Sequence, residues 1–129
     1  MTLMSVRVGC NDLEASRAFY DNTFEALGIG KSQAPAEYGI LMYKMGNGPA
    51  FLVGAARDGQ PATHANGGTI GFVAPNAEAV AAWHAAGLAN GGTCDGPPGP
   101  RPIAGGANGA YLRDPDGNKL AVYHGLNMG

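Results

Sequence analysis

The sequence predicts an α+β domain assembled from two copies of one βαβββ module. Shifting the chain by 64 positions places residues 6–15 on residues 70–79 and residues 19–20 on residues 83–84. Both copies read as a strand, a polar cap and a helix. The chain has 129 residues, enough for one core, so we expect a single domain of residues 1–129. Module one covers about residues 1–60 and module two about residues 65–129.

In module one, apolar side chains alternate with polar or small ones over residues 5–10, which is the two-residue period of a strand. Asn11 or Asp12 can cap a helix that runs from about residue 13 to residue 27, and Gly28 follows as a stop. We expect strands over residues 38–44 and 50–54, and a further short strand near residues 29–33.

Module two repeats this order. A strand over residues 70–74 precedes Asn76, a cap for a helix over residues 77–89. Strands over residues 109–113 and 118–123 flank residues 114–117, where Pro115 and Gly117 suit a type I turn. We therefore assign Asp114 and Asp116 to the turn and not to an acid/base pair. A short strand is expected near residues 93–96, and the last strands overlay at a shift of 69.

Composition limits the classes of partner and compartment. The formal net charge is -2 and no basic stripe occurs, so the sequence predicts no nucleic-acid binding. No apolar run reaches the ~20 residues of a membrane span, and residues 1–7 lack signal-peptide features. Cys10 and Cys94 form no CxxC pair and have no evident activating base, so we expect buried, inert thiols in a cytoplasmic protein.

Residues 6–20, residues 68–75 and the ending Arg-Asp-Pro-Asp-Gly-Asn-Lys-Leu of residues 113–120 resemble the vicinal oxygen chelate superfamily. This superfamily contains glyoxalase I, bleomycin-resistance proteins and extradiol dioxygenases. The resemblance covers nearly the whole chain. It implies a glyoxalase-like fold, in which two βαβββ modules form an open eight-stranded cup around the site.

The resemblance also implies a divalent metal, held by His and Glu from the first and last strands of each module. The matching positions here hold Ser5, Thr69, Leu52 and Ala121. Neutral hydroxyl groups are poor ligands and hydrocarbon side chains cannot bind a metal, so the sequence predicts no metal and no other cofactor. His64, His84 and His124 are expected to face solvent or to cap backbone groups.

Strand parity indicates which side chains face the cup, and no catalytic residue is assigned among them. Arg7 faces an anionic ligand, pairs with a carboxylate of the chain, or reaches water. Tyr111 and Tyr123 stack on a flat ligand or fill the core. Residues 96–109 are expected to form a mobile flap over the mouth of the cup. The predicted ligand-binding pocket consists of Ser5, Arg7, Leu52, Thr69, Gly71, Tyr111, Ala121 and Tyr123.

Two functions follow from the resemblance and the missing ligands. The first is a small-molecule binding protein of the glyoxalase/bleomycin-resistance type, without catalytic metal and with an anionic ligand as the hypothesis. The alternative is a glyoxalase-like lyase or isomerase with an altered or metal-free active site. The sequence leaves open whether the protein is an enzyme. The exposed strand edges of an open cup favour partners, so a homodimer is expected.

Overall fold

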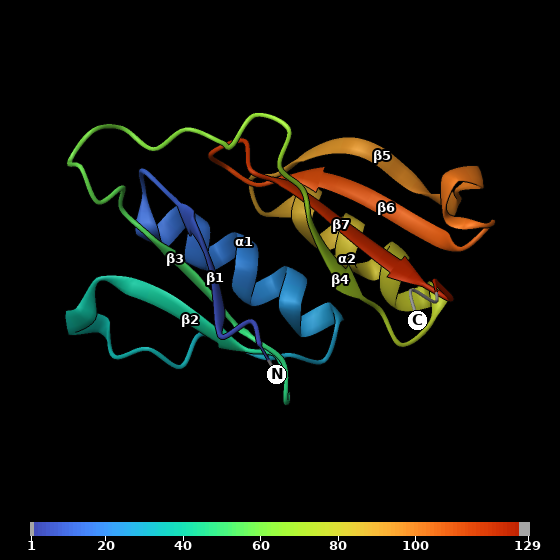
Figure 1. Ribbon diagram of the computed structural model, residues 1–129, viewed down its shortest axis with the longest axis horizontal. Coiled ribbons are helices and arrows are strands. Elements are labelled where there is room, and N and C mark those ends of the chain that lie inside the picture. The colour runs from blue at the N-terminus through green and yellow to red at the C-terminus, as the bar shows by residue number, and fades with distance from the viewer. Residues whose placement is uncertain (1, 127–129) are drawn as a thin grey trace.

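Two modules lie side by side in the computed structural model, which describes residues 2–126. Figure 1 shows a sheet in each module with one helix behind it, and the long segment between β3 and β4 arching along one side. The elements in chain order are β1 (Ser5–Gly9), α1 (Leu13–Ala26), η1 (Ala36–Tyr38), β2 (Ile40–Lys44), β3 (Ala50–Gly54), β4 (Ile70–Val73), α2 (Ala77–Ala89), β5 (Thr93–Pro100), η2 (Pro102–Ala104), β6 (Asn108–Arg113) and β7 (Lys119–His124).

The register of the strands confirms the repeat and the α+β fold class. The strand orders are β1-β3-β2 and β4-β7-β6-β5, and neither sheet closes on itself. The first strand of each module pairs in parallel with its last strand. Arg7 is opposite Leu52 in one sheet, and Gly71 is opposite Ala121 in the other. The first strands therefore overlay at a shift of 64 and the last strands at 69, as the sequence predicts.

Both predicted helices are confirmed, and their caps explain where they begin. The Asp12 carboxylate accepts hydrogen bonds from the backbone N–H groups of Glu14 and Ala15, each at 3.1 Å. The Asn76 side chain accepts from the N–H of Ala79 at 2.8 Å. Each cap satisfies backbone donors that have no partner within the first turn.

One apolar core joins the two modules. Phe24 of α1 lies at its centre, with ring centroids 4.8 Å from Tyr43, 5.5 Å from Phe51 and 5.1 Å from Phe72. Tyr43 and Phe51 belong to the first sheet, whereas Phe72 belongs to β4 of the second. Edge-to-face packing of these rings across the boundary holds the two sheets in one arrangement.

Seven strands are present among residues 2–126, not the eight that the resemblance implies, because residues 29–33 form no strand. Only one ladder-like bond forms there, from the Gln33 N–H to the Met42 carbonyl oxygen at 2.8 Å. The N–H of Met42 donates instead to Oγ of Ser32 at 3.0 Å. A side chain thus takes the donor that a strand partner would have used.

Strand β5 runs to Pro100, beyond the predicted end at residue 96, so only residues 101–107 connect it to β6. Its register shifts twice along β6, between Cys94 and Gly96 and between Gly96 and Gly99. β5 is the outer strand of its sheet, and such irregular edges tolerate prolines, which cannot donate to a ladder. Residues 96–100, the first part of the expected flap, therefore belong to a strand.

The hairpin between β6 and β7 is fastened to module one by buried polar groups. Asp114, which is 4% exposed, accepts from the Tyr20 hydroxyl at 2.5 Å and from the Asn118 side-chain N–H at 2.9 Å. Its other carboxylate oxygen accepts from the backbone N–H groups of Asp116 and Asn118, both at 2.9 Å. The assignment of Asp114 to a tight turn is confirmed by the bond from the N–H of Gly117 to its carbonyl oxygen.

None of the described helices has the length and apolar character of a membrane span.

Candidate ligand cavity

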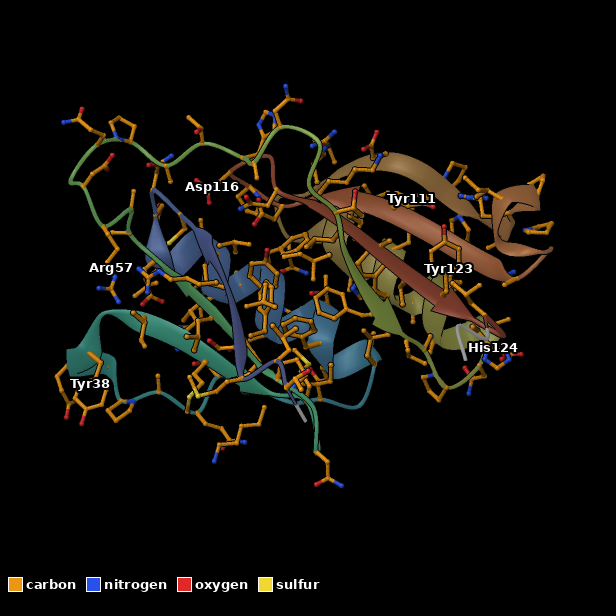
Figure 2. All side chains as sticks on the ribbon, viewed as in Figure 1. Tyr38, Arg57, Tyr111, Asp116, Tyr123 and His124 are labelled. Carbon is orange, nitrogen blue, oxygen red and sulfur yellow. The ribbon has the colours of Figure 1, made fainter. Side chains whose placement is uncertain are left out.

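A cavity of about 760 Å³ lies on the face of the second sheet that is turned away from α2. Figure 2 shows Tyr111 and Tyr123 close together over β6 and β7. We call this site the tyrosine cavity. Its lining residues are Thr69, Gly71, Phe72, Val73, Ile103, Ala104, Tyr111, Ala121, Tyr123 and Leu126.

Strand parity explains why these side chains gather on one face. Leu112 and Val122 are fully buried in the core, beneath α2. Their neighbours in sequence, Tyr111 on β6 and Tyr123 on β7, point to the opposite face and are partly exposed. Ile103 reaches the cavity from η2 and is 91% exposed, so the far side of the cavity is open.

The two tyrosines are held in a fixed arrangement. Their rings are nearly perpendicular, at 85° with centroids 5.9 Å apart, and their hydroxyl groups are hydrogen-bonded to each other. Neighbouring glycines leave room for the rings. A Cβ added at Gly109 would lie 2.5 Å from Cε1 of Tyr123, and one added at Gly96 would lie 2.9 Å from Cδ2 of Tyr111. The paired hydroxyls and Thr69 are the polar groups of an otherwise apolar wall.

Gly71 leaves the centre of the cavity empty. A Cβ added there would meet no other atom within 4 Å, although Gly71 lies in β4 opposite Ala121. Both residues are small, so the middle of the sheet leaves empty volume in the cavity and no large side chain fills it. A second, apolar groove of about 470 Å³ runs from Gly71 towards β1 and shares Phe72 and Val73 with the tyrosine cavity.

Five of the eight predicted pocket residues line the tyrosine cavity: Thr69, Gly71, Tyr111, Ala121 and Tyr123. The other three, Ser5, Arg7 and Leu52, lie in the first sheet. Arg7 lines a separate depression of about 290 Å³ and donates a hydrogen bond to the carbonyl oxygen of Ala55 at 2.7 Å. Among the described residues it forms no ion pair with a carboxylate.

The cavity residues that strand parity missed come mainly from outside the strands. Ile103 and Ala104 belong to η2, and Leu126 follows the last strand. No periodic pattern marks such residues, because their approach to the cavity depends on how residues 101–107 fold back over β6. The Pro/Gly-rich stretch was the only signal, and it indicated a loop without indicating which side chains face inwards.

Positive charge surrounds the Tyr111 ring. The Lys119 amine lies 5.1 Å from the ring centroid, and the Arg101 guanidinium carbon lies 5.5 Å from it. Asp95 forms ion pairs with Arg113 at 3.1 Å and with Lys119 at 3.5 Å. Three cations and one carboxylate therefore stand on this side of the sheet, which leaves a net positive charge beside the tyrosines.

The residues at the positions where the resemblance implies metal ligands do not fit a metal. The register makes Leu52 and Ala121 equivalent, and neither has a donor atom. Ser5 and Thr69 offer only hydroxyl groups, which are weak ligands unless they lose a proton. Within residues 2–126, no group of three or more His, Cys, Asp or Glu side chains is placed to hold an ion.

Two sequence-based expectations about single residues are wrong. Cys94 is exposed, whereas Cys10 is buried as expected, and burial raises the pKa of the Cys10 thiol. His84 is 8% exposed and faces neither solvent nor a helix end, and burial lowers the pKa of its imidazole. His64 and His124 are exposed, as expected. His84 is buried on the same helix as Val80 and Trp83. Its overlay on the buried Tyr20 was a signal in the sequence that the expectation of a solvent-facing histidine did not use.

Comparison with known proteins agrees with this architecture. No curated protein matches the chain. A crystal structure of a glyoxalase/bleomycin resistance protein from Albidiferax ferrireducens T118 is similar, with a TM-score of 0.87 and 47% identity over 96% of this chain and 99% of that chain. A glyoxalase-related enzyme from Fulvimarina pelagi has a TM-score of 0.77 and 23% identity over 96% and 88% of the two chains.

A lactoylglutathione lyase from Agrobacterium tumefaciens has a TM-score of 0.67 and 24% identity over 99% of this chain and 96% of that chain. At this identity, as for the Fulvimarina protein, the likeness is one of fold. The family model of the Glyoxalase/Bleomycin resistance protein/Dioxygenase superfamily matches residues 2–122. With its two repeated modules and its matching family model, the chain belongs to the glyoxalase/bleomycin resistance protein/dioxygenase superfamily.

Proposed function

We propose that the chain is a small-molecule binding protein of the glyoxalase/bleomycin-resistance type, which holds its ligand in the tyrosine cavity without a catalytic metal. The observation that carries this proposal is the composition of the cavity wall. A volume of about 760 Å³ is lined by apolar and aromatic side chains, with one threonine and two phenols as its polar side chains. Volumes of about 300–1,000 Å³ with few polar groups are typical of small-molecule sites. No carboxylate, imidazole or thiol lines the cavity within the described part of the chain.

The wall favours a flat ligand with an anionic substituent. Tyr111 and Tyr123 line the cavity with two nearly perpendicular rings, and aromatic side chains in a cavity wall suit an aromatic or conjugated molecule. The net positive charge around Tyr111 favours a carboxylate or phosphate at that end. Fold likeness alone gives no ligand, so the proposal depends on these side chains.

The test is a thermal-shift panel of anionic and neutral aromatic compounds, followed by calorimetry on the best ones. Lys119→Met should weaken anionic compounds about 10-fold and leave neutral ones nearly unchanged, since one charge-assisted contact is worth about 1.5 kcal/mol or more. Arg7→Met is the matched control, because Arg7 lies in the other sheet. If Arg7→Met alone weakens anionic compounds, the ligand binds at the first sheet instead.

The alternative is a glyoxalase-like lyase or isomerase with a metal-free site, and the hydrogen-bonded tyrosine pair is the observation that favours it. Two phenols can donate to a substrate oxygen, but among the described residues no imidazole, carboxylate or thiol lines the cavity to act as the base. We expect protein purified without chelator or metal affinity to hold less than stoichiometric Zn, Ni, Fe or Mn. Turnover of the methylglyoxal–glutathione adduct should stay at background with and without added metal. Elemental analysis and a spectrophotometric assay measure both, and metal-dependent turnover would establish the enzyme.

We also propose that the protein forms a homodimer. Val73 is 82% exposed and Ile103 is 91% exposed, and both border the open side of the tyrosine cavity. Exposed apolar side chains beside a cavity and unpaired strand edges are typical of surfaces that a second chain covers. Sedimentation equilibrium at micromolar concentration should give twice the chain mass of 13.1 kDa. A Val73→Glu variant should shift the protein towards the monomer, and a wild-type monomer at this concentration would contradict the proposal.

A further inference from the structure

A cysteine and a histidine meet on the side of the second sheet opposite the tyrosine cavity. Cys94 lies on β5 and His84 on α2, which packs behind that sheet in Figure 1. Their Sγ and Nε2 atoms are 3.1 Å apart, within hydrogen-bond distance for sulfur. The residues are ten positions apart in the chain and come together only because β5 returns along the helix.

The two partners differ in their access to solvent. Cys94 is exposed, whereas His84 is 8% exposed and makes no other side-chain hydrogen bond among the described residues. Burial lowers the pKa of the imidazole, so the ring is neutral at neutral pH. A neutral ring with its proton on Nδ1 has a free electron pair on Nε2, towards which the thiol can donate. The sulfur is thus reachable from solvent while its proton has an acceptor inside the protein.

Within residues 2–126, no charged group competes for either partner. The pKa of His84 has burial as its only resolved cause. Asp95 follows Cys94 in the strand but pairs with Arg113 and Lys119 instead. Within the described residues, the titratable side chains on the elements packed around the pair make no hydrogen bond or ion pair with it: Glu14, Arg17, Tyr20, Asp21 and Glu25 of α1, Glu78 of α2, Asp95 of β5, Tyr111 and Arg113 of β6, and Lys119, Tyr123 and His124 of β7.

We propose that Cys94 is a covalent modification site for soft carbon electrophiles of the α,β-unsaturated carbonyl class, with His84 as the acceptor of the thiol proton. The thiol proton passes from sulfur to Nε2. The sulfur electron pair then forms an S–C bond to the β carbon, and the π pair of the alkene moves to the α carbon and carbonyl. That enolate takes a proton from water or from His84, so the addition needs no oxidant and releases no leaving group. The site is independent of the tyrosine cavity, which lies on the other face of the sheet.

The experiment uses N-ethylmaleimide, an electrophile of this class, on the full native chain at neutral pH. Mass spectrometry of peptides follows Cys94 and Cys10 separately in the same molecules. Cys94 should react at least about 10-fold faster than Cys10, which is buried and serves as the internal control. In His84→Gln, which keeps a polar group but removes the base, the Cys94 rate should fall about 10-fold, because the thiol proton loses its acceptor.

Cys10 also reports whether the variant stays folded, because unfolding would expose it. If His84→Gln unfolds, the native protein decides the question by comparison with glutathione, a free thiol, at the same pH. Cys94 should react faster with N-ethylmaleimide than glutathione does, because its thiol proton has an acceptor in the protein. A Cys94 rate at or below that of glutathione would overturn the proposal. So would an unchanged Cys94 rate in folded His84→Gln, or a wild-type Cys94 that reacts no faster than Cys10.

Discussion

A valine in place of Gly71 is expected to abolish ligand binding in the tyrosine cavity while leaving the fold intact. A Cβ at this position meets no other atom within 4 Å, so the isopropyl group enters empty space and occupies volume that a ligand needs. Glycine weakens a strand interior by roughly 0.5–1 kcal/mol, and valine suits a strand, so the melting temperature should hold or rise. Compounds that bind the wild type should lose at least about 10-fold in affinity, or about 1.4 kcal/mol.

Calorimetry on Gly71→Val and Gly71→Ala measures this effect against a matched control. Alanine stiffens the backbone in the same way but adds a single carbon, so its stability should rise while most of the binding remains. If the stability of Gly71→Val rises while its affinity falls, the valine has filled the cavity, because a damaged fold would lose both. Equal affinity of Gly71→Val and wild type for the same compounds would place the ligand elsewhere.

The second large effect concerns stability. Asp114→Ala should lower the free energy of unfolding by about 2–5 kcal/mol, because the hydrogen bonds that the carboxylate accepts from Tyr20 and Asn118 are lost in buried surroundings. The buried carboxylate accepts four hydrogen bonds, two of them from side chains. Its loss leaves the Tyr20 hydroxyl without its acceptor inside the core, where Tyr20 is fully buried. An unsatisfied buried donor alone costs about 1–3 kcal/mol. Urea unfolding followed by circular dichroism gives the measurement.

Asp58→Ala is the matched control for this substitution. Asp58 also accepts a backbone hydrogen bond within a turn, from the N–H of Gln60 at 2.9 Å, but it is exposed. Its replacement should change the unfolding free energy by less than about 1 kcal/mol. Tyr20→Phe removes one donor and leaves Asp114 in place, so it should lie between the two. Similar losses for Asp114→Ala and Asp58→Ala would mean that the buried network does not fasten the hairpin to module one.

Local signals in the sequence were sufficient for the repeated architecture. Alternation over residues 5–10 and 70–74, with Asp12 and Asn76 as caps, predicted both first strands and both helices. Residues 29–33 show the limit of such signals. Their composition is compatible with a strand, but Ser32 satisfies the N–H of Met42 through its side chain and replaces the ladder. Such a choice depends on where the neighbouring strand lies, which local sequence does not specify.

Prediction of the site needed knowledge of the tertiary structure more than prediction of the fold did. Parity predicted Gly71, Tyr111 and Tyr123 on one face, because alternation along a strand is a local property. Whether Arg7 shares their cavity depends on how the two sheets are oriented, and this follows from packing of aromatic rings across the module boundary. The structure places Arg7 in its own depression beside Ala55.

The sequence by itself determined the family, the two-module plan and both helices. These features depend on residue type and on spacing along one element. Only the tertiary structure decided which side chains meet across elements: the η2 residues over the tyrosine cavity, and His84 beside Cys94. The physical reason is that periodicity fixes the direction of a side chain relative to its own backbone, whereas the path of the connecting segments and the packing of the core fix what that side chain contacts.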